Sequence, residues 1–136
     1  MIQGFGIDLT EIARVKRAVE KTPSFVKRIL TPPELEQLAK LGGQRRYEYI
    51  AGRWSLKEAF AKAWGTGIGR EVGFQDIAII NNQSGRPIVV KSPFEGQVWA
   101  SVSHTKDLVM TEIILERTSD QKTEIILERT SDQKND

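Results

Sequence analysis

Residues 44–64, QRRYEYIAGRWSLKEAFAKAW, form the longest helical pattern of the chain and decide how the fold is organised. Good helix formers fill this segment, and Gly65 follows it in the place where glycine commonly ends a helix. Trp54, Phe60 and Trp64 also belong to it. A helix with several large aromatic side chains is packed on more than one side, so we expect a central helix whose charges are partly shielded from water.

The segments on either side of this helix predict an α+β fold. Thr31-Pro32-Pro33-Glu34 has the pattern of a capping box with proline at the first helical position, which starts a helix after Thr31. The expected elements are a strand over 2–7, helices over 12–21, 25–30 and 32–41, and strands over 76–82, 87–91, 98–103 and 108–115, with a hairpin turn at 82–85. One leading strand, then helices, then strands indicate a small antiparallel sheet packed with helices.

Composition limits the classes of protein to which the chain can belong. Its 136 residues suffice for one domain, and 39% hydrophobic and 28% charged residues are usual values for a globular protein. It has no cysteine, which excludes disulfides, zinc–thiolate sites, iron–sulfur clusters and a cysteine nucleophile. Because apolar runs are short and the first residues do not resemble a signal peptide, we expect a cytoplasmic protein with no membrane partner.

One segment of the chain occurs twice. Residues 111–122, TEIILERTSDQK, recur unchanged as residues 123–134, which indicates a recent duplication or an artefact rather than a functional repeat. We therefore divide the chain into one domain, residues 1–116, and a tail, residues 117–136. Residues 123–136 carry four acids and two bases, so residues 1–122 have a net charge of +4 instead of the +2 of the whole chain. The basic body of the protein predicts an acidic partner.

A first group of candidate residues lies where the leading strand meets the first helix. Asp8 follows Gly6 and Ile7 at the expected end of this strand, where a carboxylate can reach a cation or a phosphate-bound ion. Asp8 or Thr10 can equally cap the helix that follows. Glu11 is expected as an acid of the first helical turn that interacts with the helix dipole rather than as a ligand.

A second group lies on the central helix. Glu58 and Lys62 are four residues apart and share a helical face, as do Arg53 and Lys57. On an exposed helix the Glu58–Lys62 pair would add only about 0.3–0.5 kcal/mol of stability. Partly shielded charges of both signs instead suit a metal–phosphate site, in which a carboxylate holds Mg²⁺ and cations neutralise phosphate oxygens. Both interpretations are open at this point.

A third group surrounds His104, the only histidine. Ser103, His104 and Thr105 lie at the end of a predicted strand, and they suit recognition of phosphate or a nucleotide better than a serine–histidine pair, because adjacent strand residues point to opposite faces. A turn histidine without a role is the alternative. The chain has no P-loop and no dinucleotide-binding fingerprint, and its glycine-rich segment 65–69 follows a helix rather than preceding one.

Together, three motifs resemble those of one family. The chain contains G-I-D-x-x-E-I-x-R at 6–14, A-G-R-W-S-x-K-E-A-F-x-K-A-x-G-T-G-I-G at 51–69 and S-x-S-H-T at 101–105. In this order and spacing they resemble the holo-acyl-carrier-protein synthases, the small phosphopantetheinyl transferases of fatty-acid synthesis. The resemblance covers residues 1 to about 116 and implies the 4′-phosphopantetheinyl transferase fold.

The resemblance implies a reaction in which 4′-phosphopantetheine moves from coenzyme A to a serine of apo-acyl carrier protein, releasing adenosine 3′,5′-bisphosphate. Asp8 and Glu58 match the family's Mg²⁺ ligands, Glu58 would take the serine proton directly or through a metal-bound water, and Lys62 would reach the pyrophosphate. The residues implied around coenzyme A are Arg45, Arg53, Lys62, Gly65, Pro87, Ser103, His104 and Thr105. Those implied to meet the acidic carrier protein are Arg14, Arg17, Lys21 and Arg28. The family also implies a homotrimer with sites shared between subunits.

Two other functions stay open from sequence. One is a hydrolase of coenzyme A on the same fold, which would release free phosphopantetheine. The other is a non-catalytic basic module that binds an acidic protein or nucleic acid. The chain lacks the base-stacking aromatics on a strand platform that a single-strand binder uses, so we expect no nucleic-acid partner.

Overall fold

The computed structural model describes residues 1–118, and the second copy of the repeat lies outside the described residues. The first copy contributes its residues 111–116 to a strand. The elements in chain order are β1 (Ile2–Glu11), α1 (Ile12–Lys21), α2 (Phe25–Ile29), α3 (Pro32–Leu38), α4 (Gly43–Trp64), the 3-10 turn η1 (Phe74–Asp76), β2 (Ala78–Asn81), β3 (Pro87–Lys91), β4 (Gln97–His104) and β5 (Leu108–Glu116).

The helices largely follow the sequence prediction. The predicted capping box of α3 is formed, with the Glu34 carboxylate accepting hydrogen bonds from the backbone N–H and the hydroxyl of Thr31. Gly65 ends α4 in the left-handed conformation, with φ of 109°. Helix α3 stops at Leu38, three residues earlier than predicted.

The junction of β1 and α1 differs from the prediction. β1 continues through Asp8 and Thr10 to Glu11, and α1 begins at Ile12 without a side-chain cap. Asp8 and Thr10 are therefore not helix caps. Glu11 occupies the cap position and is not an acid of the first turn. The extension occurs because β1 pairs along this whole stretch with β5, from Asp8 opposite Thr111 to Glu11 opposite Leu108.

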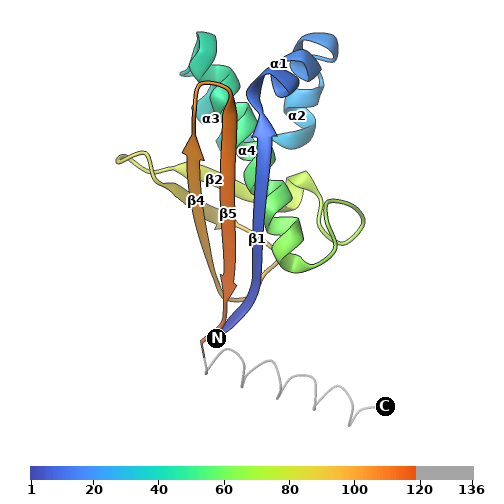
Figure 1. Ribbon diagram of the computed structural model, residues 1–136, viewed down its shortest axis with the longest axis vertical. Helices are drawn as coiled ribbons and strands as arrows, with labels where there is room; N and C mark the ends of the chain where they lie inside the picture. Colours follow the sequence, from blue (N-terminus) through green and yellow to red (C-terminus); the bar gives the residue numbers. More distant parts are fainter. Residues whose placement is uncertain (119–136) are drawn as a thin grey trace.

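The strands form two antiparallel sheets instead of one. β1, β5 and β4 make a three-stranded sheet with β5 in the middle, while β2 and β3 form a separate hairpin. Figure 1 shows α4 behind the three-stranded sheet, with α1, α2 and α3 gathered at one end of it. The opposite face of the sheet carries no helix of residues 1–118.

Two glycines allow β1 to lie directly against α4. A Cβ atom on Gly6 would be 2.0 Å from the carbonyl oxygen of Ala59, and one on Gly4 would be 2.1 Å from that of Ala63. No side chain fits at either position, and the alanines of α4 keep the other side of the contact small. This close approach brings the end of β1 alongside Ser55, Glu58 and Lys62 of α4.

A buried ion pair fixes α4 to the elements packed on its other side. Lys57 and Glu34 are both fully buried, and their charged atoms are 2.6 Å apart. The Lys57 ammonium also donates to the carbonyl oxygens of Ile29 and Phe74, so all three of its protons have acceptors. Glu34 accepts in addition from the backbone N–H of Ile79. One lysine thus joins α2, α3 and η1 to α4.

No helix within residues 1–118 combines the length and the apolar character that crossing a lipid bilayer requires.

Candidate active site

Asp8 is the best-connected side chain of the candidate site. Its Oδ2 accepts hydrogen bonds from the hydroxyls of Thr10 at 2.7 Å and Ser55 at 2.8 Å. Its Oδ1 accepts one from Lys62 at 3.0 Å. Burial raises the pKa of Asp8, but these hydrogen bonds and the charge of Lys62 outweigh it and hold the pKa below its ordinary value. Asp8 is therefore ionised at neutral pH.

Glu58 is the second carboxylate of the site, and its pKa is shifted in the opposite direction from that of Asp8. Burial raises its pKa, the negative charge of Asp8 raises it further, and Lys62 only partly offsets both effects. Asp8 and Glu58 line one pocket. Two acids whose surroundings move their pKa values apart are a common arrangement in catalytic sites.

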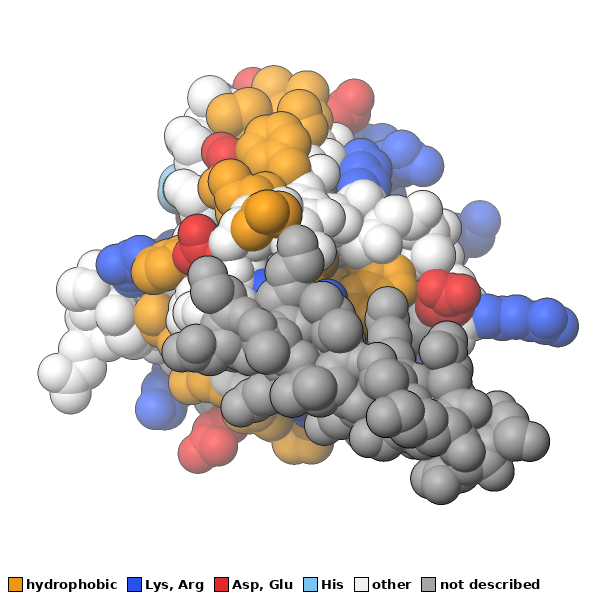
Figure 2. Space-filling view, turned by 90° about the horizontal axis from the view of Figure 1, so that it is seen from below, with side chains coloured by type: hydrophobic (Ala, Val, Ile, Leu, Met, Phe, Trp, Pro, Cys, Tyr) orange, Lys and Arg blue, Asp and Glu red, His pale blue; other side chains and the backbone are white. Residues whose placement is uncertain are grey.

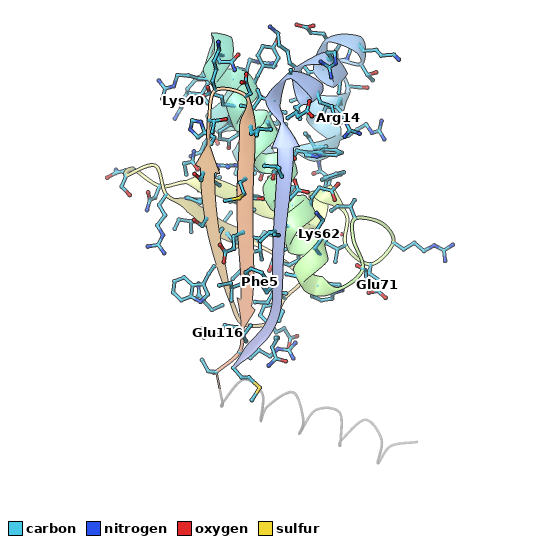
Figure 3. The ribbon with its side chains drawn as sticks, in the orientation of Figure 1. Phe5, Arg14, Lys40, Lys62, Glu71 and Glu116 are labelled. Carbon is cyan, nitrogen blue, oxygen red and sulfur yellow. The ribbon has the colours of Figure 1, made fainter. Side chains whose placement is uncertain are left out.

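The charge of Lys62 lowers the pKa of both carboxylates. Its ion pair, however, is with Asp8 and not with Glu58, which the i, i+4 spacing on the helix would favour. Its ammonium pairs with Asp8 and donates a second hydrogen bond, of 3.1 Å, to the carbonyl oxygen of Ile7 on β1. The i, i+4 pair with Glu58 is thus replaced by a contact between helix and strand. The side chain of Lys62 is half exposed, so its ammonium remains accessible to a ligand. Figure 3 shows Lys62 on α4 beside β1.

The pocket beside these residues has a volume of about 420 Å³. Its lining includes Asp8, Glu11 and Glu58 and, on α1, Arg14. Phe25 and Trp54 supply an aromatic wall, with their ring centroids 5.4 Å apart. The pocket therefore combines three acids, one cation and an apolar surface.

The acidic pair of this pocket suits a Mg²⁺ ion that also binds a substrate phosphate. Mg²⁺ is commonly held by one or two carboxylates, with waters and phosphate oxygens as its remaining ligands. Residues 1–118 contain no group of three or more histidine, cysteine, aspartate or glutamate side chains placed to chelate an ion. The mutual repulsion of Asp8 and Glu58 is the kind that a divalent cation relieves.

A second pocket, of about 530 Å³, lies at the other edge of the three-stranded sheet. It is lined by Arg45, Arg53, Pro87 and His104, four of the residues that the family resemblance placed around coenzyme A. The two pockets have no lining residue in common. The first pocket takes its residues of the three-stranded sheet from β1 and the second from β4, and these strands are the two edges of that sheet (Figure 1).

Arg53 differs from the other cations because it is only 3% exposed. Its guanidinium lies over the Tyr49 ring, 4.3 Å from the ring centroid, and donates to the side-chain oxygen of Asn81. Its Nε has no hydrogen-bond partner within the described residues. The charge of Arg53 therefore reaches the second pocket from a fixed, stacked position.

The remaining predicted residues are not brought into that pocket. Gly65 ends α4, Ser103 is exposed on β4, and Thr105 uses its hydroxyl to accept hydrogen bonds from the backbone N–H groups of Asp107 and Leu108 in the β4–β5 turn. None of the three is among the residues that line the second pocket. Their assignment to coenzyme A stays a prediction.

Comparison with known proteins gives the chain a family. The sequence profile described as "4′-phosphopantetheinyl transferase superfamily" matches residues 4–113. The chain belongs to this superfamily. Among curated relatives, the holo-[acyl-carrier-protein] synthase of Limosilactobacillus reuteri (strain DSM 20016) is 63% identical over 116 residues, which cover 85% of this chain and 97% of the relative.

Solved structures of the superfamily confirm the fold. A holo-(acyl-carrier-protein) synthase from Bacillus anthracis str. Ames in complex with CoA (3′,5′-ADP) has a TM-score of 0.80 and 42% identity, covering 87% of this chain and 99% of that one. The Helicobacter pylori holo-[acyl-carrier-protein] synthase in complex with coenzyme A has a TM-score of 0.72 and 29% identity, covering 82% and 99%. The expected α+β transferase fold is therefore confirmed.

Sequence reasoning missed the polar residues that hold Asp8. Ser55 precedes Glu58 by three positions and so shares its helical face, which is a signal that could have been used. Thr10 was interpreted as a cap and instead contacts Asp8. Tyr49 precedes Arg53 by four positions on α4, so this contact also had a helical signal, whereas Asn81 comes from β2 and its contact with Arg53 has no sequence signal.

Proposed function

We propose that this chain transfers the 4′-phosphopantetheine group of coenzyme A to a serine of apo-acyl carrier protein, giving holo-acyl carrier protein and adenosine 3′,5′-bisphosphate. The observation that carries the proposal is the pocket lined by Asp8 and Glu58, with Lys62 paired to Asp8 beside it, within a chain that closely resembles proteins named holo-[acyl-carrier-protein] synthase. We further expect a cytoplasmic enzyme of fatty-acid synthesis.

Glu58, Lys62 and Asp8 each have a part in the proposed transfer. The serine oxygen attacks the phosphorus that bears pantetheine, and the bond from this phosphorus to the bridging oxygen of the nucleotide breaks. Glu58, whose raised pKa makes it a better base than an ordinary glutamate, accepts the serine proton. Lys62, with its ammonium half exposed, neutralises the charge that develops on the departing nucleotide phosphate. Asp8 holds this ammonium in place.

Asp8 and Glu58 would also hold Mg²⁺. When bound, the ion would offset the negative charge of the coenzyme A pyrophosphate. Lys62 provides a fixed positive charge beside the same carboxylates.

The carrier protein is proposed to dock on the basic surface formed by Arg14, Arg17, Lys21 and Arg28. All four side chains are exposed, and Arg14 also lines the acidic pocket. This surface on α1 and α2 therefore continues into the site where the serine must arrive. Charge complementarity of this kind sets the orientation and rate of docking more than its strength.

Reversal of one charge tests the docking surface. Arg14→Glu is expected to raise the KM for carrier protein about tenfold or more, because like charges would then face each other. The KM for coenzyme A should change little. Lys40→Glu, which makes the same charge change in the turn that follows α3 (Figure 3), is the matched control and should leave both values near those of the unaltered protein. Equal effects of Arg14→Glu on both KM values would contradict the assignment.

We also propose a homotrimer in which each site is completed by two chains. The helix-free face of the three-stranded sheet exposes Phe5, Leu9 and Met110 to 56%, 64% and 55%. Ile7 and Trp99 are exposed on the same sheet. Figure 2, seen from below, shows hydrophobic side chains gathered at the top of the view. An exposed apolar surface of this kind typically binds another protein surface. A ring of copies would bring the β1 edge of one chain to the β4 edge of the next.

The transfer is tested by the intact mass of a bacterial apo-acyl carrier protein incubated with this protein, coenzyme A and Mg²⁺. We expect a gain of about 340 Da that disappears when a chelator removes the ion. Cleavage of coenzyme A without a gain in carrier mass would instead indicate a hydrolase. Glu58→Gln keeps the shape of the side chain and should nearly abolish the gain. Full activity of this variant would contradict the role of Glu58.

A further inference from the structure

Two buried hydroxyls lie beneath Asp8, on the side away from Lys62. Ser55 of α4 and Thr111 of β5 are 0% and 1% exposed. The Ser55 hydroxyl lies 2.8 Å from Asp8 Oδ2 and 2.8 Å from the Thr111 hydroxyl. Neither hydroxyl is accessible to substrate, and the transfer described above uses neither of them. Within this site, the two hydroxyls can therefore affect the reaction only through their hydrogen bonds to Asp8.

The direction of these hydrogen bonds follows from the number of protons. An ionised carboxylate only accepts, so Ser55 must donate its one proton to Asp8. The Ser55 oxygen then has only lone pairs left for its second contact, and Thr111 must donate to it. The result is a directed chain from Thr111 through Ser55 to Asp8. Hydrogen bonds in such a chain polarise and strengthen one another in a buried setting.

The chain of hydroxyls fixes how the carboxylate is turned. Oδ2 accepts from both Ser55 and Thr10, which leaves Oδ1 on the open side, where it meets the half-exposed Lys62. The three elements involved are held together independently, because Asp8 and Thr111 are direct partners in the β1–β5 pairing and Gly6 keeps β1 against α4. A carboxylate held in this way cannot rotate to exchange its two oxygens without breaking buried hydrogen bonds.

We propose that Ser55 and Thr111 are positioning residues, which orient Asp8 so that Oδ1 is presented to the divalent cation and to Lys62. The inference rests on the proposed function, since it takes Asp8 as a cation ligand. Hydrogen bonds that orient a ligating side chain are typically worth a factor of about 10–100 in metal affinity. The buried pair thus fixes the geometry of Asp8 from the side opposite the open pocket.

A matched pair of substitutions at Thr111 separates the hydroxyl from packing. Thr111→Val keeps the shape of the side chain and removes the proton donor, whereas Thr111→Ser keeps the donor and removes a methyl group. The probe is Mn²⁺, whose binding to the protein in the presence of coenzyme A is followed by electron paramagnetic resonance. We expect about a tenfold or greater rise in the Mn²⁺ dissociation constant for Thr111→Val and little change for Thr111→Ser. Equal changes in the two variants would overturn the proposal.

The variant Ser55→Ala extends the test along the chain of hydroxyls. It should weaken Mn²⁺ binding at least as much as Thr111→Val, and the double variant Ser55→Ala/Thr111→Val should weaken it no further than Ser55→Ala alone, because Thr111 acts only through Ser55. Additive losses would contradict a linear chain. Circular dichroism and urea unfolding establish that each variant is folded. If Thr111→Val does not fold, the comparison of Ser55→Ala with Ser55→Cys, which retains a weak donor, decides the question in the same way.

Asp8→Asn distinguishes failure of this inference from failure of the proposed function. If Asp8→Asn weakens Mn²⁺ binding and Thr111→Val does not, the cation site stands and the positioning role is wrong. If neither variant changes Mn²⁺ binding, or the unaltered protein binds no Mn²⁺, the cation site itself is wrong and the positioning role fails with it.

Discussion

Asp8 and Glu58 are carboxylates of one pocket, yet their surroundings move their pKa values in opposite directions. Three hydrogen bonds and the charge of Lys62 stabilise the ionised form of Asp8, whereas Glu58 experiences burial and the negative charge of Asp8. The difference suits a division of work in which one acid stays ionised and the other exchanges a proton. Lys62 is the side chain that couples them, because it lowers the pKa of both.

Removal of the Lys62 charge should therefore change the titration of Glu58. In the absence of divalent cations, Glu58 is expected to titrate above an ordinary glutamate, and Lys62→Met should raise its pKa further because the charge that lowers it is gone. Since protons and cations compete for the same oxygens, cation affinity should fall as the pH drops through this pKa. Carbon-13 NMR of the side-chain carboxyl measures the shift. Lys106→Met, in the β4–β5 turn, is the control and should leave Glu58 unchanged.

Lys57 shows why charge alone does not identify a catalytic residue. It precedes Glu58 in the sequence, but it is fully buried and its three protons are all donated to Glu34 and two carbonyl oxygens. Lys57→Met leaves the Glu34 carboxylate buried without its cation, which typically costs about 3–5 kcal/mol of unfolding free energy. Urea unfolding measures this loss. The double variant Lys57→Met/Glu34→Gln should lose less than the sum of the single losses; strict additivity would mean that the pair contributes no coupling.

The contact between β1 and α4 is the element pair that builds the acidic pocket. Asp8 comes from the strand, while Ser55, Glu58 and Lys62 come from successive turns of the helix. The distances from Asp8 to these helix side chains depend on how closely the backbones of β1 and α4 approach each other. The absence of side chains at Gly4 and Gly6 sets that approach, so two small residues of β1 position a site whose polar groups lie further along the strand.

A methyl group at this contact should disturb both stability and the site. Gly6→Ala places a Cβ atom within 2.0 Å of the Ala59 carbonyl oxygen, so the strand must move away from the helix. We expect a loss of about 1–3 kcal/mol in unfolding free energy, as for other overpacked contacts, together with weaker Mn²⁺ binding. Gly69→Ala, at a loop position where nothing lies within 4 Å of the added atom, is the control. Similar stability of the two variants in urea would contradict the close contact.

The two halves of the candidate site line separate pockets of one chain, with no lining residue in common, and we propose that they meet only between chains. The acidic half uses the β1 edge of the three-stranded sheet and the basic half uses the β4 edge, with α4 packed behind both. The exposed apolar face between these edges offers a surface on which copies can assemble. A ring with the same contact between every pair of neighbours would complete as many sites as it has chains.

Mixing of inactive chains tests whether sites are shared. Glu58→Gln lacks the acidic half and Arg45→Ala/His104→Ala lacks the basic half, so each is expected to be inactive alone. In rings formed by co-expression of both, about a quarter of the sites should combine two intact halves and recover activity in the carrier-mass assay. Co-expression of Glu58→Gln with Asp8→Asn, which damages the same half twice, should recover none. No recovery in the first mixture would place each whole site on one chain.

Much of the local structure follows from the sequence because its causes are local. The capping box at Thr31 and Glu34, the helical period of residues 44–64 and the turn at 82–85 involve neighbours along the chain, and each is formed where expected. The acidic residues Asp8 and Glu58 and the basic surface of α1 could also be found, because a motif in order and spacing identifies residue types without their geometry. The family, and with it the fold, followed from the same motifs.

Contacts between distant segments were decided by the tertiary structure alone. Pairing of β1 with β5 extends the strand through Asp8 to Glu11, so that Asp8 is a strand residue and not the expected helix cap. Lys62 pairs with Asp8, fifty-four positions away, and not with Glu58 on its own helix. Sequence periodicity describes only neighbours on one element. The partners of Asp8, the burial of Lys57 and the separation of the two pockets depend on how β1, α4 and β5 pack, because that packing sets which charges are desolvated and which remain within hydrogen-bond distance.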